Sequence, residues 1–360
     1  MRILVTGGCG FLGSHIVEHL IKTVPEAAIV ILDKLTYASS GLDRLRDILL
    51  GDGTRAIDRV RVLGCDLSQP IPAGVTEEVG AIDYVIHTAA ETHVDNSILD
   101  PLPFYQSNVI GTHHLLWWVR AQLAIRRVFL ISTDEVYGPA GFWQEPESVD
   151  ERAPFRPANP YAAAKAGGEA IGMAYANTYK LPITIVNTMN LYGERQHVEK
   201  FIPKTIRAVL TQTVLPIHAD PTRTQPGQRF YIHCRNFASA LVWMIEWDYR
   251  ARANALGNGR DPDEAAMQCM PLKIHIAGER ELSNLELAKM IAGFVGMPLR
   301  YELVDFHSSR PGHDLRYVMS DAAARRLGWS QPLNTEQSLE RVVRWYLDPA
   351  HQRKWLGIPT

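Results

Sequence analysis

Two acidic side chains stand next to each other in the stretch LISTDEVYG, residues 130–138. Asp134 and Glu135 follow an apolar run and the hydroxyl group of Thr133, so we expect them where a buried strand ends. Like charges at close range repel each other, which raises the pKa of one of the two carboxyl groups. Such a pair can offer one protonated and one ionised carboxyl to a substrate. An ordinary solvated turn is the alternative, and the rest of the chain has to decide between the two.

A glycine-rich loop near the start of the chain predicts a phosphate-binding site. The stretch TGGCGFLGS, residues 6–14, directly follows an apolar run and opens a helix pattern. Gly7, Gly10 and Gly13 allow a tight turn, and they let a pyrophosphate approach the free N–H groups at the start of that helix. A tight turn that binds no ligand is the alternative explanation.

The acids that end the next two apolar runs indicate which dinucleotide such a loop would hold. Asp33 lies about 20 residues after Gly13, where a carboxylate can bind the ribose hydroxyls of NAD and repel the extra phosphate of NADP. Lys34 beside it leaves some capacity for NADP. Asp66 could meet the adenine amino group, or it could be an ordinary cap at the end of its strand.

A tyrosine and a lysine lie four residues apart in PYAAAK, residues 160–165. This spacing places Tyr161 and Lys165 on one face of a helix, and Pro160 suits the first turn of that helix. A free phenol has a pKa near 10 and is a poor base at neutral pH, but a neighbouring ammonium and the positive nicotinamide of NAD⁺ would stabilise the phenolate. Tyr161 could then accept a hydroxyl proton while hydride leaves the same carbon. An exposed Tyr–Lys pair on a surface helix is the alternative.

Alternating strands and helices must position these residues. Apolar runs that read as strands buried on both faces occupy residues 2–6, 28–33, 60–66, 84–89, 128–133 and 183–188. Helix patterns lie between them at residues 13–22, 108–122 and 160–179. This alternation predicts an α/β fold with a doubly wound parallel sheet, in which ligands bind outside the carboxyl ends of the strands.

The second half of the chain is less regular. After a basic, proline-marked segment at 194–229 we expect a helix at 236–247, a Gly/Asn/Asp-rich connector at 248–270 and a strand at 273–278. Residues 281–296 read as a helix capped by Ser283. This half would form a smaller C-terminal domain over the open edge of the sheet.

Composition excludes several other classes of protein. Hydrophobic residues make up 46% of the 360 residues and charged residues 21%, and the net charge of −2 favours neither nucleic acid nor an anionic membrane. The four cysteines are scattered, which fits reduced thiols in a cytoplasmic protein. No apolar run is long enough for a membrane span, and we expect no signal peptide before the first strand. His113 and His114 are neighbours on a helix and do not converge, so we expect no metal site.

The motifs together resemble the extended short-chain dehydrogenase/reductase family, whose members act on nucleotide sugars. The resemblance rests on TGGCGFLGS, YAAAK and NLYG, residues 190–193, and it is closest to the dTDP-glucose 4,6-dehydratases. Further matching stretches are DKLTYA (33–38), HTAAETHVDNSI (87–98), STDEVYG (132–138), NPYAAAK (159–165), EKFIP (199–203) and RPGHDLRY (310–317). Epimerases of the same superfamily lack the combination of DKLTYA with TDE.

The resemblance implies a role for each acid. Tyr161, with Lys165, would take the proton of the sugar's 4-hydroxyl while hydride passes from C4 to NAD⁺, and Thr133 would hold that hydroxyl. Glu135 would then remove the C5 proton, and Asp134 would protonate the 6-hydroxyl so that it leaves as water. Hydride return to C6 completes a 4-keto-6-deoxy sugar, and NAD is regenerated as a bound cofactor.

The resemblance also implies two sets of binding residues. Those for the cofactor are Gly7, Gly10, Phe11, Leu12, Gly13, Asp33, Lys34, Leu35, Thr36, Asp66, Leu67, Ala89, Ala90, Glu91, Thr92, Ser107, Tyr161 and Lys165. Those for a nucleotide-diphosphate hexose are Thr92, Thr133, Asn190, Lys200, Phe201, Arg229, Asn284, Arg310 and His313. Lys200, Arg229 and Arg310 would form a cationic clamp on the diphosphate.

The resemblance further implies a domain division and a homodimer. Residues 1–190 with about 229–248 would form the Rossmann-type NAD-binding domain, and 191–228 with about 249–360 the nucleotide-sugar domain. Helices beginning near 108 and 160 would pair between subunits, where Trp117 and Trp118 would pack in the core or at the interface.

The chain departs from the family at three places. Leu191 stands where the family has a second asparagine, the segment at 218–233 is longer than its counterpart, and residues 250–270 are an insertion without a counterpart. The base is therefore left open among dTDP, UDP, CDP and GDP. A nucleotide-sugar 4-epimerase would share Tyr161, Lys165 and NAD but would have no use for the acid pair. A non-catalytic NAD-binding protein is the remaining alternative.

Overall fold

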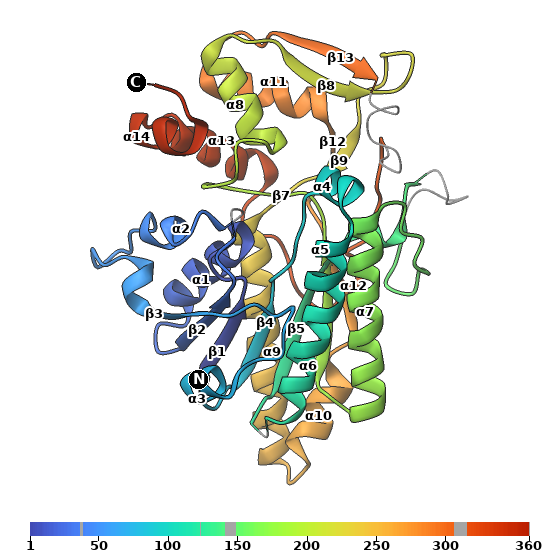
Figure 1. Cartoon of the computed structure of the whole chain (residues 1–360). Coiled ribbons are helices and arrows are strands. Elements are labelled where there is room, and N and C mark those ends of the chain that lie inside the picture. The colour runs from blue at the N-terminus through green and yellow to red at the C-terminus, as the bar shows by residue number, and fades with distance from the viewer. Residues whose placement is uncertain (37–38, 123, 141–148, 306–314, 360) are drawn as a thin grey trace.

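A seven-stranded parallel sheet forms the centre of the larger part of the molecule (Figure 1). The computed structural model describes residues 1–36, 39–122, 124–140, 149–305 and 315–359. The strand order is β11-β6-β5-β4-β1-β2-β3, and every neighbouring pair is parallel. The strands are β1 (Arg2–Thr6), β2 (Ala28–Asp33), β3 (Val60–Gly64), β4 (Tyr84–His87), β5 (Arg127–Thr133), β6 (Ile183–Thr188) and β11 (Lys273–Ile276).

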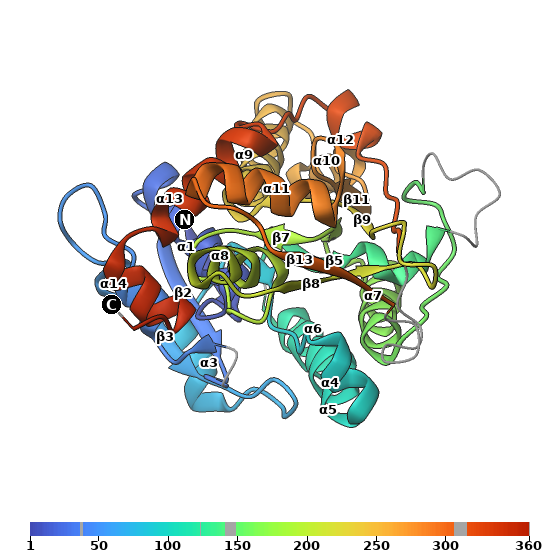
Figure 2. The ribbon, with the colours of Figure 1, turned by 90° about the horizontal axis from the view of Figure 1, so that it is seen from above.

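Helices cover both faces of this sheet, as Figure 2 shows with α6 and α9 on opposite sides of the strands. Along β1, Ile3 and Val5 belong to one apolar cluster with residues of α1 (Phe11–Thr23) and α9 (Cys234–Gly257). Leu4 between them belongs to the opposite cluster, with residues of α6 (Gly111–Arg120) and α7 (Pro160–Tyr179). Because successive side chains of a strand point to opposite faces, the apolar runs mark strands buried on both sides. The doubly wound α/β fold is confirmed.

Shorter elements complete the larger part and lead into the site. They are α2 (Asp43–Arg46), η2 (Ala56–Arg59), α3 (Ala73–Val79), α4 (Val94–Leu99), α5 (Leu102–Tyr105), the π-helical turn η3 (Gln106–Ile110), the 3-10 turn η4 (Asp134–Tyr137), α10 (Pro262–Cys269) and α12 (Ala322–Arg326).

A smaller part lies beyond the carboxyl ends of the strands, at the top of Figure 1. Its strands form three pairs: β8 (Leu215–Ala219) with β13 (Tyr301–Asp305), β9 (Gln228–Phe230) with β12 (Glu281–Ser283), and β7 (Leu191–Tyr192) with β10 (Ile232–His233). Its helices are α8 (Phe201–Thr211), α11 (Asn284–Val295), α13 (Thr335–Tyr346), α14 (Pro349–His351) and η6 (Gln352–Leu356). Ser283 caps α11 as expected, since its hydroxyl accepts from Glu286 N.

The expected connector at 248–270 is wrong. Helix α9 continues to Gly257, and α10 packs against it. Asp248 is fully buried within α9, where it accepts from Arg127 Nε and from Arg252 Nε at 2.7 Å each. Polar composition was misleading because these charges face inward and pair. The turn between the two helices carries Asn258 and Gly259, while Asn254 and Gly257 belong to α9.

Other boundaries shift by a few residues. The strands expected at 60–66, 84–89 and 273–278 end early, at Gly64, His87 and Ile276, because the chain leaves the sheet to form loops around the site. The helix expected at 108–122 begins as η3 and ends at Arg120. The strand β11, expected at 273–278, pairs with β6 at the edge of the large sheet. The division of the chain into two domains stays a prediction. No helix within the described ranges is long and apolar enough to cross a membrane.

Candidate active site

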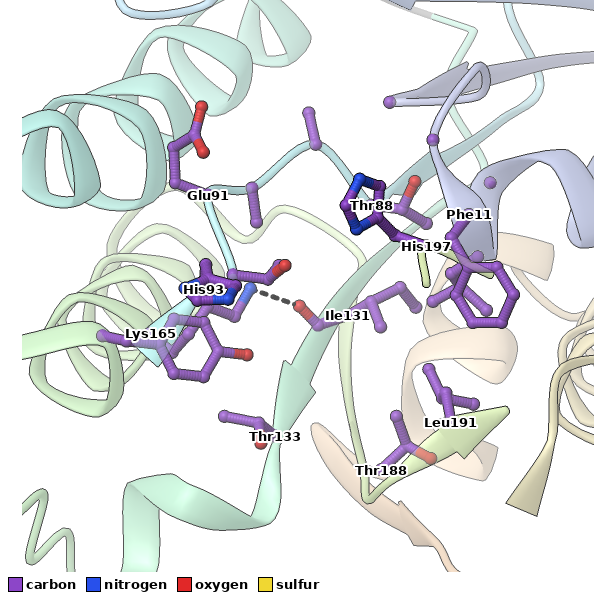
Figure 3. Close-up of a pocket in the computed structure, with 18 of the residues that line it drawn as sticks. Phe11, Thr88, Glu91, His93, Ile131, Thr133, Lys165, Thr188, Leu191 and His197 are labelled. Atoms are coloured by element: carbon purple, nitrogen blue, oxygen red, sulfur yellow. Dashed lines mark hydrogen bonds between the residues drawn. The ribbon is translucent and has the colours of Figure 1, made fainter. Parts of the chain in front are cut away.

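A cavity of about 480 Å³ opens at the carboxyl ends of β1, β2, β4, β5 and β6 (Figure 3). The loop before α8 and the strand β9 close it from the side of the smaller part. Its walls contain the expected residues Gly7, Gly10, Phe11, Leu12, Gly13, Asp33, Lys34, Thr36, Asp66, Leu67, Ala89, Ala90, Glu91, Thr92, Ser107, Thr133, Asp134, Glu135, Tyr161, Lys165, Asn190, Lys200, Phe201 and Arg229. The fold therefore brings the glycine loop, the Tyr–Lys pair and the acid pair to one cavity.

Two expected residues that the structure describes, Leu35 and Asn284, are not among its walls. Leu35 lies at the end of β2 in a left-handed conformation and does not line the cavity. Asn284 lies behind the wall, where its Oδ1 accepts from the hydroxyl of Tyr231, a lining residue, at 2.7 Å. Arg310 and His313 lie outside the described residues.

The glycine loop at one end of the cavity is shaped by close backbone contacts. Gly7 has a φ of +68°, and Gly10 N donates to the carbonyl of Gly7 at 3.0 Å. A Cβ on Gly13 would lie 2.1 Å from that same carbonyl oxygen, so only glycine fits there. Helix α1 begins at Phe11, and its first N–H groups lack partners within the helix. The loop is thus a cradle for an anion of the pyrophosphate type.

Asp33 has a structural role that the sequence did not reveal. Its two oxygens accept from Cys9 N at 2.9 Å and from Leu35 N at 2.8 Å, which fixes the carboxylate at the end of β2. Each carboxylate oxygen can accept a second bond, so a ligand hydroxyl can still be bound. Lys34 and Asp66 form an ion pair at 2.9 Å on the rim, with both side chains partly exposed.

The two adjacent acids lie in different environments. Asp134 is buried and accepts from the hydroxyl of Thr133 at 2.9 Å. Glu135 is partly exposed and accepts from Asn159 Nδ2 at 3.1 Å. Burial, together with the charge of Glu135, raises the pKa of Asp134 to about 7. The pair therefore holds one carboxyl that keeps its proton near neutral pH.

Tyr161 and Lys165 lie on the first two turns of α7. Asn159 caps this helix by accepting from Ala162 N at 2.8 Å, and Pro160 is its first residue, as expected. Lys165 Nζ donates to the carbonyl of Ile131 on β5 at 2.7 Å (Figure 3). Burial lowers the pKa of Lys165 to about 8, against the effect of Glu169. Burial and the charges of Glu135 and Asp134 raise the pKa of Tyr161 above its usual value.

Arg229 on β9 lines the cavity and is held in place by backbone carbonyl groups. Its Nη1 donates to the carbonyl of Gln228 at 2.7 Å and to that of Leu315, and its guanidinium lies 4.9 Å from the ring centre of Tyr317. Lys200 precedes α8 on the same side, and Leu191 lines the wall.

Sequence reasoning missed several lining residues, among them Thr88, His93, Thr188, Gln196, His197, Tyr231 and Tyr317. Thr88, His93 and Tyr317 lie in the matching stretches 87–98 and 310–317 but were not singled out, and the others come from loops and strand ends outside those stretches. Asn159 could have been found, since an asparagine before proline at a helix start is a capping signal. No group of three or more metal-ligating side chains gathers anywhere in the described part of the chain.

Comparison with known proteins shows what this fold and site resemble. The family model described as "NAD dependent epimerase/dehydratase family" matches residues 3–255. The dTDP-glucose 4,6-dehydratase of Mycolicibacterium smegmatis is 34% identical over 349 residues, which are 96% of this chain and 93% of that protein. A trifunctional UDP-glucose 4,6-dehydratase/epimerase/reductase of Arabidopsis thaliana is 33% identical over 360 residues, but the chain spans only 48% of its length.

A solved structure of a 4,6-dehydratase is similar to this chain in fold and in sequence. The crystal structure of a dTDP-glucose 4,6-dehydratase from Streptomyces venezuelae, with NAD bound, has a TM-score of 0.75 and 32% sequence identity. The match covers 99% of this chain and 98% of that one. UDP-glucose 4-epimerase from Thermus thermophilus has a TM-score of 0.75 at 23% identity, which shows a shared fold.

The raised pKa of Asp134 predicts a pH-dependent stability difference. Below pH 4 the carboxyl is protonated in both the folded and the unfolded chain. As pH rises from about 4 to about 7 only the unfolded chain loses the proton, so this group lowers the free energy of unfolding. Asp134→Asn has no proton to lose, so its free energy of unfolding is not lowered in this way. At pH 8 we expect the free energy of unfolding of the variant to exceed that of the wild type by roughly 2–4 kcal/mol. Urea unfolding from pH 4 to 8 measures the difference, and a difference that does not change with pH contradicts the assignment.

Proposed function

The chain belongs to the NAD-dependent epimerase/dehydratase family, and we propose that it is a nucleotide-sugar 4,6-dehydratase. It would convert a nucleotide-diphosphate hexose to the 4-keto-6-deoxyhexose and water. The observation that carries this proposal is the acid pair beside Tyr161: Asp134 buried and inclined to keep its proton, Glu135 more exposed and held by Asn159. Relatives named as 4,6-dehydratases, at 33–34% identity over nearly the whole chain, support it.

The residues present fit a bound NAD. The cradle from Gly7 to Gly13 would hold the pyrophosphate, Asp33 and its neighbours the adenosine ribose, and the residues around Tyr161 and Lys165 the nicotinamide. The remaining walls proposed for it are Phe11, Leu12, Lys34, Thr36, Asp66, Leu67, Ala89–Thr92 and Ser107. When bound, NAD⁺ supplies a hydride acceptor at C4 of the sugar and a hydride donor to C6.

The chain's own residues would move the protons. Tyr161 takes the proton of the 4-hydroxyl, which Thr133 orients. Burial and the two acids hold Tyr161 in its phenol form. The phenol can lose its proton and act as a base only when positive charge lies beside it. A cationic nicotinamide near Lys165 would supply that charge. Glu135 removes the C5 proton, and Asp134, protonated near neutral pH, gives its proton to the leaving 6-hydroxyl. When hydride enters at C6, Glu135, whose proton exchanges with solvent, would give a proton back to C5.

Positive side chains that line the cavity would bind the diphosphate. Arg229 and Lys200 are among its walls, as are Phe201 and Asn190. Arg310 and His313 complete this proposed set but lie outside the described residues. The nucleotide base and the hexose are left open, and the 4-epimerase alternative leaves Asp134 and Glu135 without a role.

One experiment separates the dehydratase from the alternatives. The purified protein is incubated in heavy water with a panel of nucleotide hexoses that includes dTDP, UDP, CDP and GDP conjugates, and the products are analysed by mass spectrometry. We expect one of them to lose one water and to gain one solvent deuteron at C5. A product of unchanged mass would mean an epimerase, and no turnover of any sugar would leave a non-catalytic NAD-binding protein.

Glu135→Gln tests the division of labour within the acid pair. The variant should still reduce bound NAD⁺ when substrate is added, because Tyr161 and Thr133 are intact. Dehydration should fall by at least about 10²-fold, the usual contribution of a general base. Absorbance at 340 nm follows the reduction and mass spectrometry follows the dehydration, with the surface change Glu246→Gln as a control. Dehydration at the wild-type rate would remove Glu135 from this role.

We also propose a cytoplasmic homodimer. All four cysteines are free thiols, three of them buried, which fits a reducing compartment. Large apolar side chains are exposed on the helices near α7: Leu99 is 84% exposed, Leu102 57% and Trp117 52%. Exposed apolar side chains gathered on one face are typical of a subunit interface.

Charge placed on this face should separate the subunits. We expect the wild type to sediment at twice its chain mass of 40.4 kDa, and Leu102→Glu with Trp117→Glu to sediment as a monomer. Leu256→Glu is the matched control, because Leu256 is 65% exposed near the end of α9, away from this face. Analytical ultracentrifugation measures both. A wild-type monomer, or a double variant that stays dimeric, contradicts this interface.

A further inference from the structure

A buried polar network lies directly behind the acid pair, and the proposed proton transfers do not use it. Its centre is Glu169, 2% exposed, one turn beyond Lys165 on α7. Glu169 Oε1 accepts from Asn187 Nδ2 at 2.7 Å, and Glu169 Oε2 lies 2.6 Å from the ammonium of Lys273. A carboxylate and an ammonium that are both buried stay charged only when they are paired, as here.

The network also holds the strand that carries the acids. Asn187 Nδ2 donates to the backbone carbonyl of Thr133 at 3.0 Å as well as to Glu169. One side-chain amide on β6 thus joins the end of β5 to helix α7. The carboxylate of Glu169 is thus oriented relative to Thr133, and Glu169 lies four residues after Lys165 on the same helix.

The hydrogen bonds beyond Lys273 have a single direction. The ammonium donates to the hydroxyl of Tyr137 at 3.1 Å, and this hydroxyl lies 2.6 Å from His275 Nε2. Since His275 Nδ1 lies 3.1 Å from the carbonyl of Ser320, it must donate there, and Nε2 must accept from Tyr137. His275 is therefore neutral, in keeping with burial, which lowers its pKa to about 3. The hydroxyl of Tyr137 and the ring N–H of His275 each have an acceptor, so this run of hydrogen bonds orients the ammonium of Lys273 beside Glu169.

The charges around Lys165 make Glu169 the group that favours its ammonium form. Burial works against this form, and Glu169 opposes that effect. His87 on β4 lies between the hydroxyls of Thr6 and Thr112, and burial and Lys165 lower its pKa to about 3, so it adds no charge. Among the described residues, the remaining ionisable groups on elements packed against α7 or in this network are Asp95 on α4, Tyr105 on α5, His113, His114 and Arg120 on α6, Arg127 on β5, Asp134, Glu135 and Tyr137 on η4, Tyr161, Tyr175 and Tyr179 on α7, and Lys273 and His275 on β11.

We propose that Glu169, oriented by Asn187 and Lys273, is a positioning residue that keeps Lys165 in its ammonium form. Residues four apart on a helix lie about 5–6 Å from each other at their Cβ atoms, close enough for a strong effect at a buried site. The use of that ammonium beside Tyr161 rests on the proposed function. The protonation of Lys165 does not, and it can be measured alone.

Competitive labelling of the lysine tests the proposal without any sugar substrate. The 360-residue chain is treated with a trace of acetic anhydride across pH 6–11, and the acetylation of Lys165 is read by mass spectrometry against a free amine standard. The wild-type midpoint should lie near pH 8. In Glu169→Gln the midpoint should fall by about one pH unit, because the favourable charge is gone while burial remains. Glu169→Asp keeps a carboxylate, so the midpoint should fall by at most half as much as in Glu169→Gln.

Asp248→Asn is the matched control. Asp248 is likewise a buried acid paired with a buried cation, Arg127, but at the opposite end of β5. The Asp248→Asn variant should have a lower melting temperature than the wild type, and the midpoint of Lys165 acetylation should be unchanged. If Glu169→Gln does not fold, Glu169→Gln with Lys273→Met leaves no unpaired ammonium and should still shift the midpoint downward.

A folded Glu169 variant with an unshifted or raised midpoint overturns the proposal and leaves Glu169 a purely structural residue. Absence of sugar turnover by the wild type would instead overturn the dehydratase proposal, and it would leave the labelling result intact.

Discussion

The end of β5 takes its last hydrogen bonds from side chains, and the whole site depends on this. All seven residues of the strand are buried. The carbonyl of Ile131 accepts from Lys165 and that of Thr133 from Asn187, after which the chain leaves the sheet as η4. Buried carbonyl groups need partners, so the residues that satisfy the strand also fix where the acid pair begins. The contacts of Lys165 with Ile131 and of Asn187 with Thr133 therefore both hold the strand and position the proposed catalytic residues.

Much of the fold and site could be predicted because the signals are local. Buried parallel strands read as apolar runs, the glycine loop joins β1 to α1 within a few residues, and Pro160 marks the first turn of α7. Once the strands are parallel, their carboxyl ends must share one edge of the sheet, which brings residues 6–14, 133–135 and 161–165 together. Topology therefore assembled most of the cavity from separate motifs.

The contacts that the sequence did not predict join residues that are distant in sequence. Asp248 looked like part of a polar connector because its partner, Arg127, lies 121 positions away. In the same way, Asp33 binds the N–H of Cys9, and Lys34 pairs with Asp66. Tyr231 and Tyr317 reach the cavity from segments without any periodic pattern. Tertiary packing decides which distant residue a side chain contacts, and the local sequence pattern does not indicate that residue.

The place of β11 in the sheet has a consequence for folding. The strand that covers the edge of β6 is Lys273–Ile276, which is reached only after the chain has passed through α8, β8 and α9. During synthesis β6 is therefore an exposed sheet edge until residue 276 has emerged, and such an edge can pair with another chain. Lys273 at the start of β11 also brings the counter-ion of Glu169. Closing the sheet and neutralising the buried acid beside the cavity are thus one late event, so an unfinished chain has neither.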